Sequence, residues 1–305
     1  MFGGLMDEGC KAAARRFSRR SLFASTGLLG LAAVGATGLN ATTDRTRQVL
    51  HSGSFEDITP MQLGPVIRTE RVYSAARNRE VDIITILPPG VRIDGLPMSL
   101  LLHGRKGNAR TAAVGGLPEL LTAGVLAHLI PAFGFIAVDG GDNYWHRSSS
   151  GDDPMTMLLD EVPQWLAERR LGGPGGTPFA CTGVSMGGFG AMLYARRRTE
   201  RGRPANAVAT ISPGLLTSWT EMSTREAFAD EAQWASLDPL RHVHELGPAP
   251  MGLWCGDRDR FIEGCRAFIG RARLEVASIT PGGHNEGYWR TVAPDVIRFL
   301  AGHVR

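Results

Sequence analysis

The stretch that most constrains the fold is residues 177–194, TPFACTGVSMGGFGAMLY. It places Ser185 between Gly183 and Gly187 in a G-x-S-x-G pentapeptide, after an apolar strand-like run and before a helical run of small residues. A serine on such a sharp strand-to-helix turn projects from the sheet, and its neighbours must be glycine because side chains there would collide. The helix behind it directs backbone N–H groups and a positive dipole end toward the hydroxyl. The pattern therefore predicts a reactive serine.

The order of the remaining elements predicts an α/β protein. Apolar runs indicate strands at 68–74, 80–87, 98–103, 135–139, 179–184, 207–212, 251–255 and 274–279, and helices at 117–130, 154–170, 188–196, 261–271 and 286–301. A leading antiparallel pair followed by alternating strands and helices implies a mostly parallel central sheet flanked by helices. This is the order of the α/β-hydrolase fold, with residues 213–247 as a short lid insertion. We expect this domain to span residues 65–305.

A serine hydroxyl needs a base, and in this fold the base follows the acid near the C-terminus. His284 lies in PGGHN, directly after the last predicted strand. The acid should follow the preceding parallel strand, where the chain reads CGDRD. Asp259 is the preferred candidate, since members of this fold often have Gly, two residues and then Asp. Asp257 remains the alternative acid.

The same chemistry needs donors for a developing oxyanion. The first expected donor is the backbone N–H of Met186, directly after the serine. The second is the backbone N–H of Arg105, in the turn HGRKG that follows the strand at 98–103. His103 in this turn is expected to be a structural histidine. Arg105 and Lys106 are expected to face an anionic or sugar-bearing substrate, or solvent.

With these residues in place, the chain resembles the esterase branch of the α/β-hydrolases. That branch includes esterase D-like enzymes, feruloyl esterases and secreted mycolyltransferases. The resemblance rests on LLLHG, GVSMGG, GDRD and GGHNEGYW and spans about residues 65–303. It implies ester hydrolysis or acyl transfer without a cofactor, with Ser185 as nucleophile, Asp259 as acid and His284 as base. The substrate would be a small-molecule or lipid ester.

Two departures favour a general esterase over a mycolyltransferase. Those enzymes use Glu as the acid and have other residues after the serine-methionine pair, whereas this chain has Asp259 and Gly187-Gly188. We therefore expect a secreted serine esterase that works through an acyl-enzyme. The alternatives are an acyltransferase that moves an acyl group to a sugar or alcohol, and a non-catalytic binding protein on the same fold.

The N-terminus predicts export. The run SRRSLF at 18–23 resembles a twin-arginine signal, and an uncharged Ala- and Gly-rich stretch to residue 43 follows it. We expect residues 1–43 to be signal and linker that contact the membrane transiently, with cleavage after a small-residue site at 34–36 and a retained anchor as the alternative. The first 36 residues carry five basic and two acidic side chains, and the remainder carries 28 of each. A neutral body gives no electrostatic reason to expect a nucleic-acid partner.

The sequence also suggests residues for substrate binding and for a disulfide. The segment DGGDNYW after the strand at 135–139 offers Asn143, Tyr144 and Trp145 as pocket residues, and Trp219 lies in the lid insertion. Core packing is the alternative for these aromatic side chains. Cys255 and Cys265 are spaced for a disulfide in an oxidising compartment, with two buried thiols as the alternative. We expect no metal site, because the sequence lacks a ligand pattern.

Overall fold

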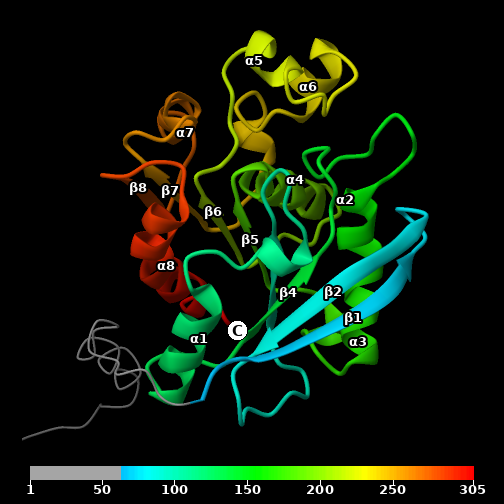
Figure 1. Cartoon of the computed structure of the whole chain (residues 1–305), viewed down its shortest axis with the longest axis vertical. Coiled ribbons are helices and arrows are strands. Elements are labelled where there is room, and N and C mark those ends of the chain that lie inside the picture. The colour runs from blue at the N-terminus through cyan, green and yellow to red at the C-terminus, as the bar shows by residue number, and fades with distance from the viewer. Residues whose placement is uncertain (1–62) are drawn as a thin grey trace, which may run out of the picture. The chain divides into compact units, whose positions relative to one another are not determined.

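An eight-stranded sheet organises the computed structural model, which describes residues 63–305 (Figure 1). The strand order is β1-β2-β4-β3-β5-β6-β7-β8. Antiparallel pairing joins β2 to both β1 and β4, and every other neighbouring pair is parallel. The strands are β1 Val66–Ser74, β2 Arg79–Leu87, β3 Met98–Leu102, β4 Gly134–Val138, β5 Ala180–Val184, β6 Ala207–Ile211, β7 Met251–Gly256 and β8 Val276–Thr280. The predicted mostly parallel sheet with a leading antiparallel pair is confirmed.

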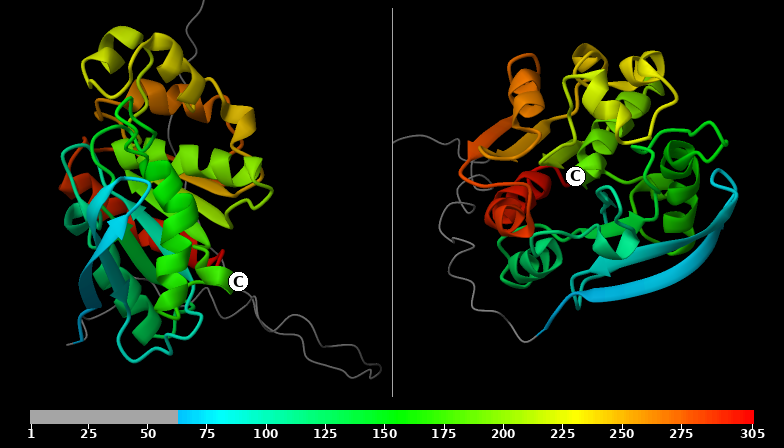
Figure 2. Two further views of the ribbon diagram at one scale, coloured as in Figure 1. Left: turned by 90° about the vertical axis from the view of Figure 1, so that its right-hand side faces the viewer. Right: turned by 45° about the horizontal axis from the view of Figure 1, so that its top comes forward.

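Helices cover both faces of the sheet (Figures 1 and 2). One apolar cluster joins α1 and α8 to one face, and a second cluster joins α3, α4 and α7 to the other. Central strands contribute to both clusters because successive side chains point to opposite faces. In β3, for example, Leu100 enters one cluster and Leu101 the other. The helices are α1 Leu117–Leu126, α2 Pro154–Thr156, α3 Val162–Glu168, α4 Met186–Glu200, α5 Trp219–Ser223, α6 Glu231–Leu237, α7 Ile262–Ile269 and α8 Glu286–Ala301.

The helix expected at 154–170 is interrupted. A π-helical segment, Met157–Glu161, separates α2 from α3. Pro163 lies at the start of α3 and has no N–H to donate, so the regular hydrogen-bond series cannot continue through it. The Val162 N–H instead reaches back five residues to the Met157 carbonyl.

The insertion between β6 and β7 forms α5, α6 and a 3₁₀ turn, Val243–Glu245. Figure 1 shows α5 and α6 at the top of the molecule, beyond the central strands. Side-chain caps start both helices, with Ser218 accepting from Glu221 and Asp230 accepting from Gln233. The expected lid region is therefore a short helical layer and not a second sheet.

The predicted export signal at 1–43 lies outside the described residues. Between residues 63 and 305, no helix combines the length and the apolar character that crossing a membrane requires.

Candidate active site

Ser185 lies at the turn between β5 and α4 in a strained backbone conformation. Its φ is 56° and its ψ is −122°, a region that residues with a side chain rarely occupy. The neighbouring glycines make this turn sterically accessible. A Cβ at Gly183 would lie 2.0 Å from the Gly187 carbonyl oxygen, and a Cβ at Gly187 would lie 2.0 Å from the Leu102 carbonyl oxygen. The predicted requirement for glycine on both sides is confirmed, because no side chain fits at either position.

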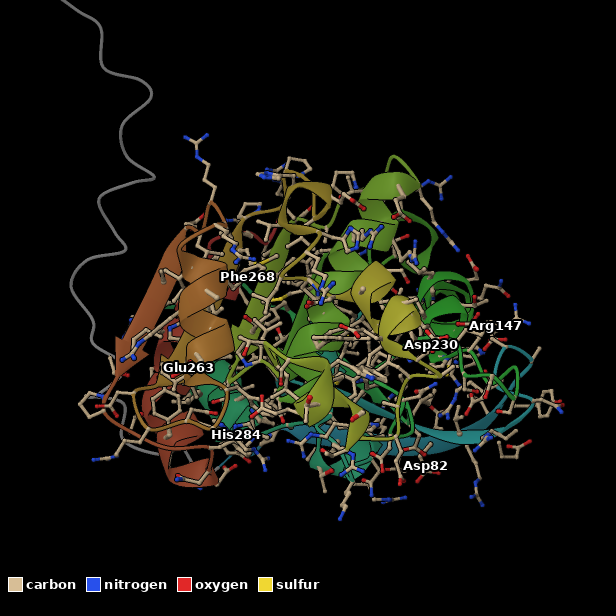
Figure 3. The ribbon with its side chains drawn as sticks, turned by 90° about the horizontal axis from the view of Figure 1, so that it is seen from above. Asp82, Arg147, Asp230, Glu263, Phe268 and His284 are labelled. Atoms are coloured by element: carbon tan, nitrogen blue, oxygen red, sulfur yellow. The ribbon has the colours of Figure 1, made fainter. Side chains whose placement is uncertain are left out.

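The structure brings the three predicted catalytic side chains into one hydrogen-bonded chain. The His284 Nε2 atom lies 3.0 Å from the Ser185 Oγ atom. On the other side of the ring, His284 Nδ1 lies 2.9 Å from Asp259 Oδ2 and 3.1 Å from Oδ1. Figure 3 shows His284 near α7, on the loop that joins β8 to α8. Serine, imidazole and carboxylate are therefore connected in the order that nucleophile activation requires.

The Asp259 carboxylate is buried and oriented. Its side chain has no exposed surface, and Oδ1 also accepts a hydrogen bond from the Phe261 N–H at 2.9 Å. Burial acts to raise the pKa of Asp259, but hydrogen bonds from the His284 ring and the Phe261 N–H, with the positive charge of His284, lower it by more. The pKa of this carboxyl lies below its usual value, so the group is held as an anion beside the imidazole.

Asp257, the alternative acid, makes a different contact. Its Oδ1 accepts from the Gly282 N–H at 2.9 Å, and its side chain is substantially exposed. Asp257 therefore holds the loop that carries His284, while Asp259 contacts the ring itself.

Two aromatic rings and one serine complete the surroundings of His284, and sequence reasoning missed all three. The Phe261 and Trp289 rings meet the imidazole edge to face, with centroids 5.0 Å and 5.4 Å away. The Trp289 Nε1–H donates to Ser212 Oγ at 3.2 Å, and the Ser212 hydroxyl also helps lower the pKa of Asp259. The position of Ser212, directly after β6, is the sequence clue that could have identified it, because polar residues at such strand ends gather at one edge.

The loop after β3 lies against the serine. A Cβ at Gly104 would lie 3.3 Å from the Ser185 Cβ atom and 3.8 Å from Oγ. Among residues 63–305, neither the Arg105 N–H nor the Met186 N–H has a hydrogen-bond partner. The two predicted oxyanion donors thus lie on the two segments that adjoin Ser185, and both are available.

His103 fixes the shape of this loop. Its Nε2 atom accepts from the Gly140 N–H at 2.9 Å, so the proton is on Nδ1, which donates to the Gly104 carbonyl at 2.8 Å. Burial lowers the pKa of His103 and keeps the ring neutral. The Gly104 carbonyl belongs to the same planar peptide as the Arg105 N–H, which points in the opposite direction. His103 therefore orients the predicted second donor.

Two of the four predicted substrate-binding residues, Tyr144 and Trp145, take the alternative of core packing. Trp145 is fully buried, with its indole N–H on the His103 carbonyl at 3.3 Å, and Tyr144 is 2% exposed, with its ring packed on Phe189. Both rings belong to the core, so they do not form an open pocket wall. Asn143 donates to the His146 carbonyl within its own loop. Trp219 stacks on Trp234 inside the insertion, with ring centroids 6.1 Å apart.

Of the two alternatives for Cys255 and Cys265, the structure has the buried thiols and not the disulfide. Both cysteines, like Cys181, are buried free thiols. Each fills core space as a small apolar side chain, and each S–H points to a backbone carbonyl, that of Gly256 for Cys255 and that of Pro213 for Cys265. Within the described residues, no group of His, Cys, Asp and Glu side chains is arranged to hold a metal ion.

Solved structures share this arrangement of elements. A ferulic acid esterase matches with a TM-score of 0.65 and 17% identity, covering 79% of this chain and 99% of its own. An S-formylglutathione hydrolase from Agrobacterium tumefaciens matches with a TM-score of 0.63 and 16% identity, covering 80% of this chain and 98% of its own. The fluorophosphonate-binding serine hydrolase F of Staphylococcus aureus matches with a TM-score of 0.59 and 16% identity, covering 78% of this chain and 99% of its own. At these identities the likeness establishes the α/β-hydrolase fold.

Sequence comparison identifies the family. A search of the curated proteins finds no match for the chain. The model of the family described as "Putative esterase" matches residues 74–263, which is more than half of the chain and includes Ser185 and Asp259. The chain therefore belongs to this esterase family of the α/β-hydrolase superfamily, and it is a serine hydrolase of the carboxylesterase type.

Proposed function

We propose that this protein is an exported esterase that cleaves carboxylic esters through a Ser185–His284–Asp259 triad and an acyl-enzyme. The observation that carries the proposal is the hydrogen-bonded chain from the Ser185 hydroxyl through the His284 ring to the buried Asp259 carboxylate. The strained turn at Ser185 and the two free N–H groups beside it support the same chemistry. Membership of an esterase family agrees with it.

The mechanism has two acyl-transfer steps. His284 Nε2 takes the proton of Ser185 Oγ as the oxygen attacks the ester carbonyl, and the new C–O bond leaves a negative charge on the former carbonyl oxygen. The N–H groups of Met186 and Arg105 stabilise this charge. As the tetrahedral intermediate collapses, His284 gives its proton to the departing alcohol. Water then repeats both steps on the acyl-enzyme and releases the acid.

Turnover of p-nitrophenyl esters by the purified protein and by Ser185→Ala tests the proposal. Alanine keeps the Cβ and removes only the attacking oxygen, so the fold should persist while kcat falls by about 10⁴-fold or more. A matched control is Ser218→Ala, which alters a helix cap in the insertion and no proposed catalytic group. Substantial activity in Ser185→Ala, with thermal unfolding unchanged, rejects the site.

Acyl transfer to a sugar or alcohol would use the same acyl-enzyme with a different acceptor. Adding an alcohol during turnover and quantifying ester and free acid separates the two outcomes. We propose water as the acceptor, and predominance of the transfer product at low alcohol concentration would contradict this choice.

The export proposal rests on Arg19 and Arg20 within SRRSLF and on the uncharged stretch that follows. Fusing residues 1–43 to a folded reporter and replacing both arginines by lysine tests it. Export of the parent fusion that is lost in the lysine variant supports a twin-arginine signal, whereas cytoplasmic retention of both contradicts it.

A further inference from the structure

Three arginines from three separate loops gather at the proposed active site. Arg105 follows Gly104, which contacts Ser185, and Arg225 lies in the insertion between α5 and α6. The Arg105 Nη2 atom donates to the Arg225 carbonyl at 3.3 Å, so the two loops touch. Arg260 directly follows Asp259, and its guanidinium lies over the Phe261 ring at 5.1 Å from the centroid. Arg105 carries the predicted oxyanion donor, Arg225 touches the Arg105 side chain, and Arg260 adjoins Asp259.

These guanidinium groups lack negative partners. Within residues 63–305, none of Arg105, Arg225 and Arg260 forms an ion pair, whereas Arg196, Arg197 and Arg201 on α4 all pair with carboxylates. The Nε–H groups of Arg105 and Arg225 are buried, and neither has a hydrogen-bond partner among the described residues. A buried charged donor left unsatisfied is costly, so an anion that accepted from these groups would stabilise them.

The positive charges of all three arginine side chains act on the Tyr144 hydroxyl. Burial raises the pKa of Tyr144, and the positive charges of Arg225, Arg105 and Arg260 oppose that rise. All three guanidinium groups are therefore within electrostatic range of one oxygen atom.

We infer that the active site binds an ester that carries a negatively charged oxyanion group, a carboxylate or a phosphate, on Arg105 and Arg225 with help from Arg260. The inference rests on the proposed function and adds the class of substrate. A guanidinium matches the planar oxygen pair of a carboxylate or phosphate, which suits it to bidentate recognition. The side chain of Arg105 would bind this anion while its backbone N–H faces the oxyanion of the reacting carbonyl.

Two matched pairs of esters test the inference and locate the anion. The acyl-side pair is 4-nitrophenyl hydrogen succinate and 4-nitrophenyl butyrate, and the alcohol-side pair is 4-butyryloxybenzoate and its methyl ester. A third arm measures whether inorganic phosphate or succinate competes more strongly, which distinguishes the two kinds of anion. We expect kcat/KM for the charged member of at least one pair to exceed that of its neutral partner by about tenfold or more.

Arg225→Gln and Arg105→Gln should reduce this charged-to-neutral ratio by about tenfold, since glutamine keeps a polar side chain and removes the charge. The control Arg92→Gln removes one charge from an arginine whose side chain is 85% exposed on the loop between β2 and β3, and it should leave the ratio unchanged. The wild-type ratio should also fall as NaCl rises from about 50 to about 300 mM, a readout that needs no variant.

The outcomes separate the two proposals. Hydrolysis of both members of each pair at equal rates, with no effect of salt or of Arg225→Gln on the ratio, overturns the inference and leaves the esterase intact. Absence of turnover with every ester overturns the proposed function and the inference together.

Discussion

The Nε2 atom of His284 lies 3.0 Å from the Oγ atom of Ser185, although 99 positions separate the two residues in the chain. The contact forms because Ser185 follows β5 and His284 follows β8, and parallel strands of one sheet end at the same edge. The buried Asp259, which follows β7, reaches the same edge and holds the other side of the imidazole ring. Three strand ends thus assemble the proposed triad.

The two aspartates after β7 should differ sharply in their effect on turnover. Asp259→Asn leaves a side chain of the same size but removes the charge that stabilises the imidazolium, so kcat should fall by about 10³- to 10⁴-fold. In Asp257→Asn the amide oxygen can still accept from the Gly282 N–H, so the loss should stay below about tenfold. Steady-state kinetics on an activated ester checks both, and a larger loss in Asp257→Asn would reverse the assignment.

His103 should act as a positioning residue. Replacing His103 by Phe removes the hydrogen bonds to Gly140 and Gly104 and frees the Gly104–Arg105 peptide to rotate. We expect kcat to fall by about 10- to 100-fold, less than for removal of an oxyanion donor. A tetrahedral boronate inhibitor should lose affinity in parallel, while KM changes little. A merely structural role would lower thermal stability without this loss of inhibitor affinity.

Gly187 should be required for packing. A Cβ there would lie 2.0 Å from the Leu102 carbonyl oxygen, so Gly187→Ala must separate β3 from α4. We expect a loss of about 3 kcal/mol in the free energy of unfolding. The control Gly270→Ala, where the nearest atom would be 3.5 Å away and φ is −68°, should change stability by less than about 1 kcal/mol. Denaturant unfolding measures both, and equal effects would contradict the steric argument.

The ionised Asp259 should contribute a pH-dependent part of the stability. Its pKa in the folded protein lies below the ordinary value of 3.8, so the stabilisation is fully present above that value and is lost as the pH falls through the folded pKa. The free energy of unfolding of the wild type should therefore exceed that of Asp259→Asn most at neutral pH. The difference should shrink at pH values below about 4. Parallel curves across this range would show that the carboxylate is not stabilised in the fold.

Much of the fold could be predicted because helices and strands leave local signals in the sequence, such as helix caps and apolar runs. The bounds of α8, Glu286–Ala301, agree with the sequence prediction, and Asn285 caps the helix as its side chain accepts from the Tyr288 N–H. Buried parallel strands read as short apolar runs, which gave β3 and β7 to within one residue. The relative placing of Ser185, Asp259 and His284 followed from the fold, since each lies in the segment between a strand and the following helix.

The contacts between loops could not be predicted, because they depend on packing between distant segments. Trp145 fills a space that Gly140 and Gly190 leave open, and a Cβ at either glycine would lie within 2.5 Å of its ring. Nothing in the order of residues shows that this tryptophan points into the core and away from substrate. The same holds for Arg225, whose meeting with Arg105 depends on how the insertion lies over the loop after β3.

Covalent labelling reports directly whether His284 activates Ser185. A fluorophosphonate probe reacts with a serine only when a neighbouring base activates it, so we expect one adduct, located on Ser185 by peptide mass spectrometry. Labelling should be much slower in His284→Gln and absent in Ser185→Ala. An unlabelled wild-type protein, or an adduct on a different serine, would contradict the assignment of Ser185 as the activated nucleophile.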